Sequence, residues 1–496
     1  MTFNSLDWII LLAYLTATVI IGLWAKKYVE DLSGYMVAGR RIKVSLGVAT
    51  FAATEIGIIT FMYFSELGYV SGFSCFVIGI LGLLAYMFVG STGFIIEPLR
   101  RLEVMTIPEF YEIRYSRRVR LIGGIILFLG GVLNMGIFLK FDGIFLSEVM
   151  GFGESALMII MIIMLVVVVL YTILGGMFSV VVTDYMQFTV LAAGILVALI
   201  AVLLNVDLSS IGETVVRQYG EAGVNPVVNS RFGWTFIIWI LISNVAAGAL
   251  WQPGASKALA SESPTVAKRV FFFTSLTFAG RAMIPMFIGI AALTYLGPNE
   301  SPSAAAPKLL GMITPHGFLG LLVAGMLAAS MSTYSAYLLA WSSVATRDVV
   351  ACLRPNNLSE KDTIRLTRIF AAAIGIFLLF FGLLYKIPDT AFQYLFITGA
   401  MYTAGALGCV TAGLYWPKAN NVGAYTSLIM GALAPAIFLI LGKFPEVLPD
   451  GLKFLVDVNI AGLLSFGLAA VGMIAGSYFT QKLSPPKQIA IGGTGE

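Results

Sequence analysis

Charged residues are scarce in this sequence. Only 11% of its 496 residues are Asp, Glu, Lys or Arg, whereas 59% are hydrophobic, and the mean hydropathy is +0.93. A soluble domain carries about 25% charged residues, so this chain could not cover a water-facing surface. The same composition excludes disordered, fibrous and nucleic-acid-binding chains. The solvent of this protein is therefore the lipid bilayer.

Residues that build enzyme and metal sites are also few. The sequence has one histidine, His316, and three scattered cysteines, Cys75, Cys352 and Cys409. These residues form neither a metal-binding spacing nor a disulfide framework. A nucleophile–histidine pair and a G-x-x-x-x-G-K-[ST] phosphate loop are both missing from the sequence, which disfavours hydrolysis and ATP-driven transport. We therefore predict that the chain is not an enzyme.

Long apolar runs dominate what the sequence does contain. A hydrocarbon core of ~30 Å needs about 20 helical residues. Thirteen runs of that kind can be placed, at 7–25, 45–70, 72–96, 121–149, 155–174, 178–205, 232–252, 269–296, 317–345, 366–386, 390–415, 422–442 and 454–479. We predict an all-α polytopic membrane protein with a single transmembrane domain over residues 1–480. Residues 481–496 are predicted to form a disordered cytoplasmic tail.

The basic residues are distributed unevenly between the two membrane faces. Thirteen spans place the termini on opposite sides. The loops of one face hold twenty-two of the thirty Lys and Arg residues, with Lys257 counted among them, and the loops of the other face hold six. Because Lys and Arg accumulate in cytoplasmic loops, we predict an external N-terminus and a cytoplasmic C-terminus. The two remaining basic residues, Lys140 and Arg281, fall within predicted spans.

Five charged residues lie where lipid should exclude them. They are Glu55, Lys140, Asp142, Asp184 and Arg281. A charge at the bilayer centre costs about 2.5–3.5 kcal/mol on insertion scales, so each needs a partner or a function. A structural ion pair with another helix is the default interpretation for Lys140 and for Asp142. For Arg281, an ion pair within the protein and an anchor for a substrate carboxylate are equally favoured.

Two of the predicted spans contain residues that interrupt a helix. Gly57 follows Glu55 in FAATEIGIITF (51–61), and Pro253 in GALWQPG (248–254) removes a helical hydrogen bond. Interrupted helices in two halves of a chain indicate inverted repeats with a binding site at mid-membrane. Glycine and proline are also frequent in ordinary membrane helices, so the pattern alone leaves both interpretations open.

A cluster of hydroxyl side chains lies in GLLVAGMLAASMSTYSAYLLAWSSVATRD (320–348). Ser332 and Ser335 are three residues apart and share a helix face, with Thr333 beside them. Hydroxyl oxygens and freed backbone carbonyls can replace water around a hard cation such as sodium. Such clusters also pack helices or bond their own carbonyls. The carboxylates in other spans favour the cation interpretation.

Four segments resemble the sodium:solute symporter family. DLSGYMVAGRRIK (31–43) resembles its cytoplasmic segment before the broken helix, and GGMFSVVVTDYMQ (175–187) its signature between the fifth and sixth spans. WQPGASKALASES (251–263) is similar to a stretch of the sodium/proline permease branch, and LAASMSTYSAYLLAWSSVATRD (327–348) to the family's sodium-binding helix. The resemblance implies a 5+5 inverted-repeat core of the LeuT type.

The core that the resemblance implies consists of repeats over about 44–205 and 232–416, with extra helices at both ends. Its function would be sodium-coupled uptake by alternating access. The shared sodium site would use the backbone carbonyls or hydroxyls of Ala53, Ile56, Ala329, Ser332 and Thr333. Glu55 stands where proline permeases carry an aspartate important for sodium, and is included in this site.

The resemblance also implies two further sets of residues. A second sodium site would involve Asp184, Ser332 and Ser335, with Ala336 in place of another hydroxyl. The substrate would lie between the broken helices. Its predicted contacts are Thr60, Asn134, Trp251 and Gln252, to which the charge analysis adds Arg281.

The substrate class follows from the walls of that site. Trp251, Pro253 and Phe278 occupy positions that give polar contacts in the galactose-transporting branch. An apolar wall with Arg281 or Lys140 as anchor favours an amino acid or another small carboxylate. The alternatives are a sugar or sialic-acid-like solute, and a solute sensor built on the same fold. Expected partners are the solute, sodium and lipid of the cell membrane, with the protein a monomer or weak oligomer.

Overall fold

The computed structural model describes residues 3–25, 38–153, 157–354, 358–385, 390–442, 444, 446 and 448–488. Within these residues the chain is helical, and its extended pairing is limited to one bridge between Ile42 and Ser261. The helices of the first half are α1 (Ser5–Ala25), α3 (Val44–Glu55), α4 (Ile58–Ser71), α5 (Phe76–Thr92), α6 (Ile96–Arg101), α7 (Ile107–Arg114), α8 (Arg117–Met135), α9 (Phe138–Met150) and α10 (Leu157–Asn205). Those of the second half are α11 (Leu208–Tyr219), α12 (Gly233–Leu250), α13 (Gln252–Leu259), α14 (Pro264–Leu296), α15 (Pro302–Ile313), α16 (Phe318–Val344), α17 (Ala351–Leu353), α18 (Glu360–Leu384), α19 (Ala391–Tyr415), α20 (Asn421–Leu441) and α21 (Val458–Phe479).

Every predicted apolar run overlaps one or two helices of the described chain. Ten helical stretches of the described chain are long and apolar enough to cross a membrane, and α1 contributes a shorter apolar one. The count is below thirteen partly because α4 and α5 form one continuous stretch, 58–92, and partly because α10 contains two predicted spans. α10 has 49 residues, more than twice the about 20 residues that one crossing needs.

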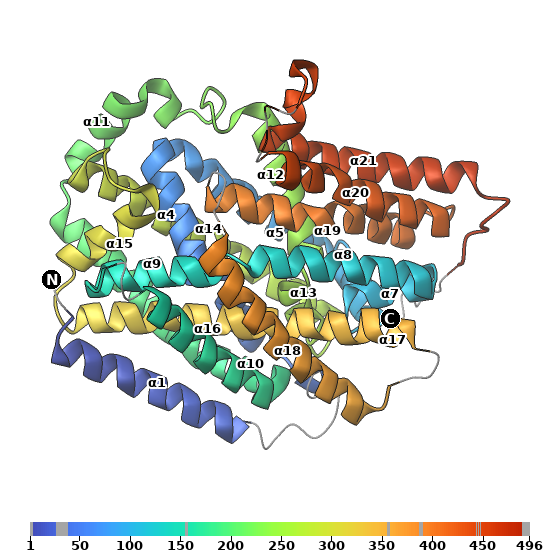
Figure 1. Ribbon diagram of the computed structural model, residues 1–496, viewed down its shortest axis with the longest axis horizontal. Coiled ribbons are helices and arrows are strands. Elements are labelled where there is room, and N and C mark those ends of the chain that lie inside the picture. The colour runs from blue at the N-terminus through green and yellow to red at the C-terminus, as the bar shows by residue number, and fades with distance from the viewer. Residues whose placement is uncertain are drawn as a thin grey trace.

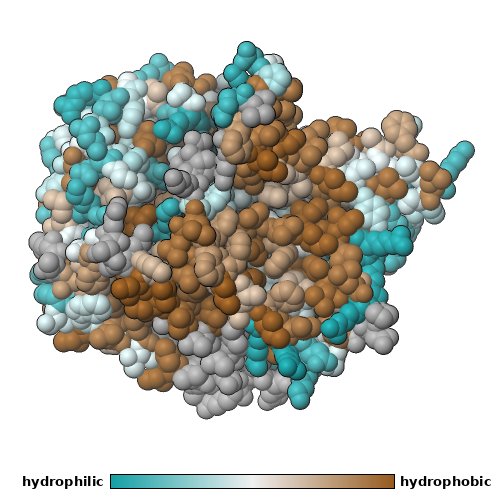
Figure 2. Space-filling view, in the orientation of Figure 1, coloured by the Kyte–Doolittle hydropathy of each residue, from teal (hydrophilic) through white to brown (hydrophobic). Residues whose placement is uncertain are grey.

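The surface confirms the membrane environment. Most of the long helices run along one direction, and α1 begins at the end of the molecule opposite to the one where α21 ends (Figure 1). A broad hydrophobic band lies between hydrophilic regions at the two ends (Figure 2). Large apolar residues such as Ile163, Leu204 and Phe380 are more than half exposed. This protein is therefore a multi-pass membrane protein whose band faces lipid.

Both predicted helix interruptions are present. The first separates α3 from α4, where Ile56 (φ −108°, ψ 91°) and Gly57 (φ −105°, ψ 172°) are extended. The second separates α12 from α13 at Trp251 (φ −73°, ψ 111°), and Pro253 fits the first turn of α13 because that turn lacks helical N–H partners. Backbone groups freed at both breaks are left for other partners.

Small residues let the broken helix α4 cross α14 closely. A Cβ atom on Gly68 would lie 1.9 Å from the carbonyl oxygen of Met286. A Cβ atom on Gly289 would lie 1.9 Å from the carbonyl oxygen of Ser65. The two backbones therefore touch, as membrane helices do where small residues replace bulky ones.

Part of the segment after α21 contacts the helical domain. Gln481 Nε2 donates to the carbonyl of Lys418 at 2.7 Å. The guanidinium of Arg114 also donates to the carbonyl of Lys487. Both contacts are made to backbone carbonyl groups, so the composition of the segment does not predict them. Residues 489–496, and the start of the segment 31–43, lie outside the described residues.

Candidate functional site

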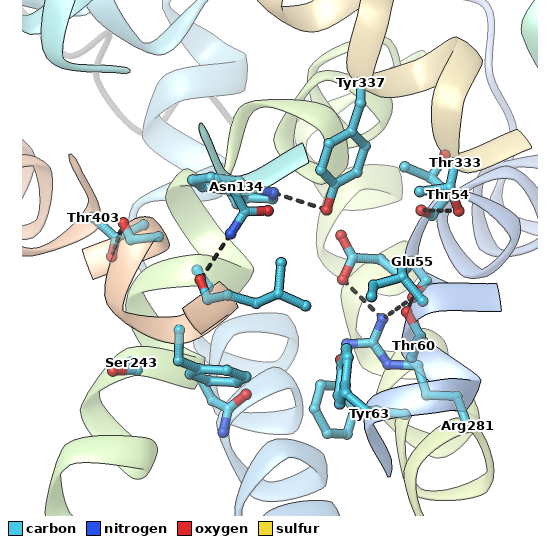
Figure 3. Close-up of a pocket in the computed structure, with 18 of the residues that line it drawn as sticks. Thr54, Glu55, Thr60, Tyr63, Asn134, Ser243, Arg281, Thr333, Tyr337 and Thr403 are labelled. Carbon is cyan, nitrogen blue, oxygen red and sulfur yellow. Dashed lines mark hydrogen bonds and ion pairs between the residues drawn. The ribbon is translucent and has the colours of Figure 1, made fainter. Parts of the chain in front are cut away.

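A cavity lies where the two helix interruptions meet. Its walls come from α3, α4, α5, α8, α9, α12, α14, α16 and α19. Figure 3 shows polar side chains on opposite sides of it, with Glu55 and Arg281 on one side and Asn134 and Thr403 on the other. The polar lining residues are Thr54, Glu55, Thr60, Tyr63, Tyr86, Asn134, Ser243, Asn244, Arg281, Thr333, Tyr337 and Thr403.

An ion pair at the first break dominates the charge of this cavity. Glu55 ends α3, and its carboxylate Oε2 lies 2.8 Å from Nη1 of Arg281 on α14. The same nitrogen donates to the carbonyl oxygen of Glu55 at 2.9 Å. Of the two interpretations of Arg281, the structure therefore realises the ion pair within the protein. Both described hydrogen bonds leave from Nη1, so the five-donor guanidinium keeps further N–H groups for another acceptor.

Aromatic rings surround this ion pair. The guanidinium carbon of Arg281 lies 4.1 Å from the ring centre of Phe278 and 5.9 Å from that of Tyr86. Across the cavity, Trp251 Nε1 donates to the hydroxyl of Tyr337 at 3.0 Å. These aromatic rings exclude water, and their faces attract the guanidinium cation. They therefore help to hold the Arg281 side chain beside Glu55. The predicted apolar wall is present at Trp251 and Phe278.

The predicted sodium residues come together at the end of α3. Ala53, Ile56 and Ala329 are buried, and Ile56 and Ala329 belong to one apolar cluster. Thr333 on α16 donates through Oγ1 to the carbonyl of Thr54 at 3.1 Å. A Cβ atom on Gly57 would lie 2.8 Å from that Oγ1, so glycine is what lets α16 approach the break. The C-terminal end of α3 adds a partial negative charge there.

A second polar cluster lies beside these residues. Asp184 on α10 is fully buried, and its Oδ1 accepts a hydrogen bond from Ser332 Oγ at 2.6 Å. The Thr50 hydroxyl and the Lys257 ammonium both reach Oδ2, the latter at 2.9 Å. Ser335 instead donates to the carbonyl of Ser332 at 2.9 Å. Ser332 is thus the residue that connects this cluster to the predicted sodium site.

Lys257 is the residue that sequence reasoning misplaced. The sequence predicts a cytoplasmic loop at this position, but Lys257 belongs to the half-helix α13 and is completely buried. The available signal was its position four residues after Pro253, one helical turn beyond the residue that begins the second half-helix. Tyr63, Ser243, Asn244, Tyr337 and Thr403 also line the cavity without having been singled out.

Two other intramembrane charges do not form the predicted ion pairs. Lys140 Nζ donates to the carbonyl oxygen of Tyr385 at 3.3 Å, and Asp142 Oδ1 accepts from Ser330 Oγ at 2.9 Å. In the described part of the chain, neither residue has an oppositely charged partner within 4.0 Å. The default interpretation of both is therefore wrong. Lys140 contacts a neutral carbonyl group instead, and Asp142 Oδ1 contacts a neutral hydroxyl group.

The predicted substrate residues divide into two groups. Thr60, Asn134, Trp251 and Arg281 all line the cavity. Asn134 Nδ2 bridges to α19, donating to the carbonyl of Leu395 at 2.7 Å. The structure does not bring Gln252 to the cavity, since its amide accepts from the N–H of Ile107 at 2.9 Å and contacts the segment before α7.

Comparisons with known proteins agree with this geometry. The profile of the sodium:solute symporter family matches residues 35–431. The sodium/sialic acid symporter of Proteus mirabilis is 24% identical over 516 residues, covering 99% of this chain and 97% of that protein. The sodium/pantothenate symporter of Haemophilus influenzae is 27% identical over 311 residues, or 61% of this chain and 60% of that protein.

A solved structure extends the comparison to the fold. A Na⁺-coupled sialic acid symporter in a substrate-bound, outward-open state superposes with a TM-score of 0.81 and 20% sequence identity, covering 98% of this chain and 99% of that one. At this identity the match establishes the fold rather than the substrate. The predicted all-α, broken-helix architecture is confirmed.

Proposed function

Since the chain belongs to the sodium:solute symporter family, we propose that it imports a small organic acid together with sodium by alternating access. The observation that carries the proposal is the convergence of both helix breaks on one cavity that holds the Glu55–Arg281 pair. Broken helices at mid-membrane supply free backbone groups to ions and substrate without exposing them to lipid. The cavity is therefore the proposed site of solute binding.

Sodium is proposed to bind beside this cavity, at the end of α3 against α16. Its ligands would be the carbonyls of Ala53, Ile56 and Ala329 and the hydroxyls of Ser332 and Thr333. The hydrogen bond of Thr333 to the Thr54 carbonyl supports this placement, because it holds two of the oxygen-bearing segments together. Glu55, turned toward Arg281, would act on the solute side of the break.

A carboxylate is the proposed anchor group of the solute. Nε of Arg281 forms no hydrogen bond within the described residues, and guanidinium binds carboxylates in a two-point geometry. Sialic acid and pantothenate, which give two of the relatives their names, each carry one carboxylate. We therefore place an acidic, sialic-acid-like solute first and an amino acid second, which reverses the order that the sequence favoured.

Uptake into proteoliposomes tests the proposal. Radiolabelled sialic acid, pantothenate, proline and galactose are supplied with an inward sodium gradient and, in parallel, with potassium on both sides. We expect sodium-dependent accumulation of an acid and no accumulation of galactose. Uptake that is equally fast in potassium would contradict sodium coupling, and uptake of galactose alone would contradict the carboxylate anchor.

A further inference from the structure

The polar cluster beside the sodium site contains its own cation. Lys257 and Asp184 are both 0% exposed, and their charged atoms lie 2.9 Å apart. Lys257 comes from α13, the half-helix after the second break, and Asp184 from α10. A buried lysine in a membrane protein is costly unless it is paired, so this contact must be maintained for α13 to pack.

Three donors surround the carboxylate of Asp184. Ser332 binds one oxygen at 2.6 Å, and the other oxygen accepts from Thr50 and from Lys257. A hydroxyl can rotate and offer a lone pair to an ion, but an ammonium group has three donors and no acceptor. A sodium ion at Asp184 would therefore lie next to the Lys257 ammonium group, which repels it and cannot serve as a ligand.

Charge balance gives the same result. Asp184 and Lys257 together are neutral, and a sodium ion added to them would leave one uncompensated positive charge in a fully buried cluster. Such a charge costs several kcal/mol in the low-dielectric interior. The end of α3 differs in the ligands that it offers, since the carbonyl groups of Ala53 and Ile56 are acceptors only and lie at the negative end of the helix dipole. The two neighbouring positions therefore differ in their ability to accept sodium.

We propose that the Lys257 ammonium is a tethered cation that fills the position at Asp184, so that each transport cycle couples the solute to one sodium ion. This inference rests on the proposed function and deepens it. It replaces the second sodium site at Asp184, Ser332 and Ser335 that the resemblance implied. Ser332 then serves both groups, as a donor to Asp184 and as an oxygen ligand in the remaining site.

The test is the sodium stoichiometry of the intact protein in proteoliposomes. For the unmodified protein we expect a Hill coefficient for sodium of about 1 and an uptake of one labelled sodium ion per labelled solute molecule. Lys257→Ala frees the Asp184 carboxylate and leaves room for an ion with water. Its Hill coefficient should rise toward about 2. The control Lys257→Arg keeps the cation and should keep the original value.

The outcomes separate this inference from the proposed function. Absence of any sodium dependence would contradict sodium coupling itself. Sodium-dependent uptake with two ions per solute in the unmodified protein would overturn only the tethered-cation inference, and this measurement holds even if Lys257→Ala does not fold. A folded Lys257→Ala protein whose sodium cooperativity is unchanged would overturn it as well. The double variant Asp184→Asn/Lys257→Gln removes both charges and should still couple to one sodium.

Discussion

At the scale of single residues, hydroxyl groups on α16 distinguish the proposed sodium site from ordinary helix packing. Thr333 and Ser332 reach across to other helices, whereas the hydroxyl of Ser342 bonds to the Leu339 carbonyl within its own helix. Ser332→Ala and Thr333→Ala should each raise the sodium concentration for half-maximal uptake about tenfold, or ~1.4 kcal/mol. Ser342→Ala is the matched control. An equal sodium requirement in all three variants would show that the hydroxyls only pack the helices.

The Glu55–Arg281 pair supports a prediction that separates its structural role from its role toward the solute. Arg281→Gln leaves the Glu55 charge unpaired in a largely buried place and should destabilise the protein by about 3–5 kcal/mol. Glu55→Gln/Arg281→Gln removes both charges, so its melting temperature should recover. Uptake of the acid should stay lost in both variants, because the guanidinium is missing. Recovery of uptake in the double variant would assign Arg281 to folding alone.

At the scale of elements, close helix crossings hold the broken helix in place. Because the backbones of α4 and α14 touch at Gly289, Gly289→Ala forces Ser65 and its neighbours to move. Overpacking of this kind costs about 1–3 kcal/mol. We expect a lower melting temperature in detergent and reduced uptake.

The control for this crossing is Gly467→Ala. Gly467 lies on α21, and a Cβ atom added there has no heavy atom within 4 Å. The helix propensity of alanine should make this variant equal to or slightly more stable than the original protein. Equal melting temperatures for Gly289→Ala and Gly467→Ala would mean that the α4–α14 crossing adapts without cost.

The positions of the two helix breaks were easier to predict from the sequence than the contacts of the half-helix α13. Pro253 removes a helical N–H and Gly57 lowers helix propensity, so local chemistry favoured breaks at both positions, although Pro285 and Pro435 lie within continuous helices. The contacts of α13 did not follow, because a short segment rich in small and polar residues, with a lysine, has the composition of a loop. Only its burial among α3, α10 and α16 made Lys257 an interior residue.

At the scale of the whole molecule, orientation in the membrane is a prediction that labelling can test. In a variant without Cys75, Cys352 and Cys409, single cysteines are introduced at Glu213 on α11 or Lys361 on α18, both exposed and at opposite ends of the molecule (Figure 1). A membrane-impermeant thiol reagent applied to intact cells should label position 213 and not position 361. Permeabilised cells provide the control, in which both should react. The reverse pattern would place the N-terminus inside.

The sequence by itself determined the solvent, the helical class, the two breaks and the clustering of hydroxyls on α16. These follow from local properties, since apolar length decides membrane insertion and glycine or proline decides where a helix can stop. It also placed Thr60, Asn134, Trp251 and Arg281 in one candidate site, where the structure brings them together.

Only the tertiary structure decided which charges are partners. Glu55 pairs with Arg281 across 226 positions and Asp184 with Lys257 across 73, whereas Lys140 and Asp142 find carbonyl and hydroxyl groups. Pairing energies in the low-dielectric interior depend on distances of a few ångströms between helices that are remote in the chain. Helix periodicity and span count do not specify those distances. The sequence therefore shows which charged residues lie in the membrane, but only the packing of the helices decides their partners.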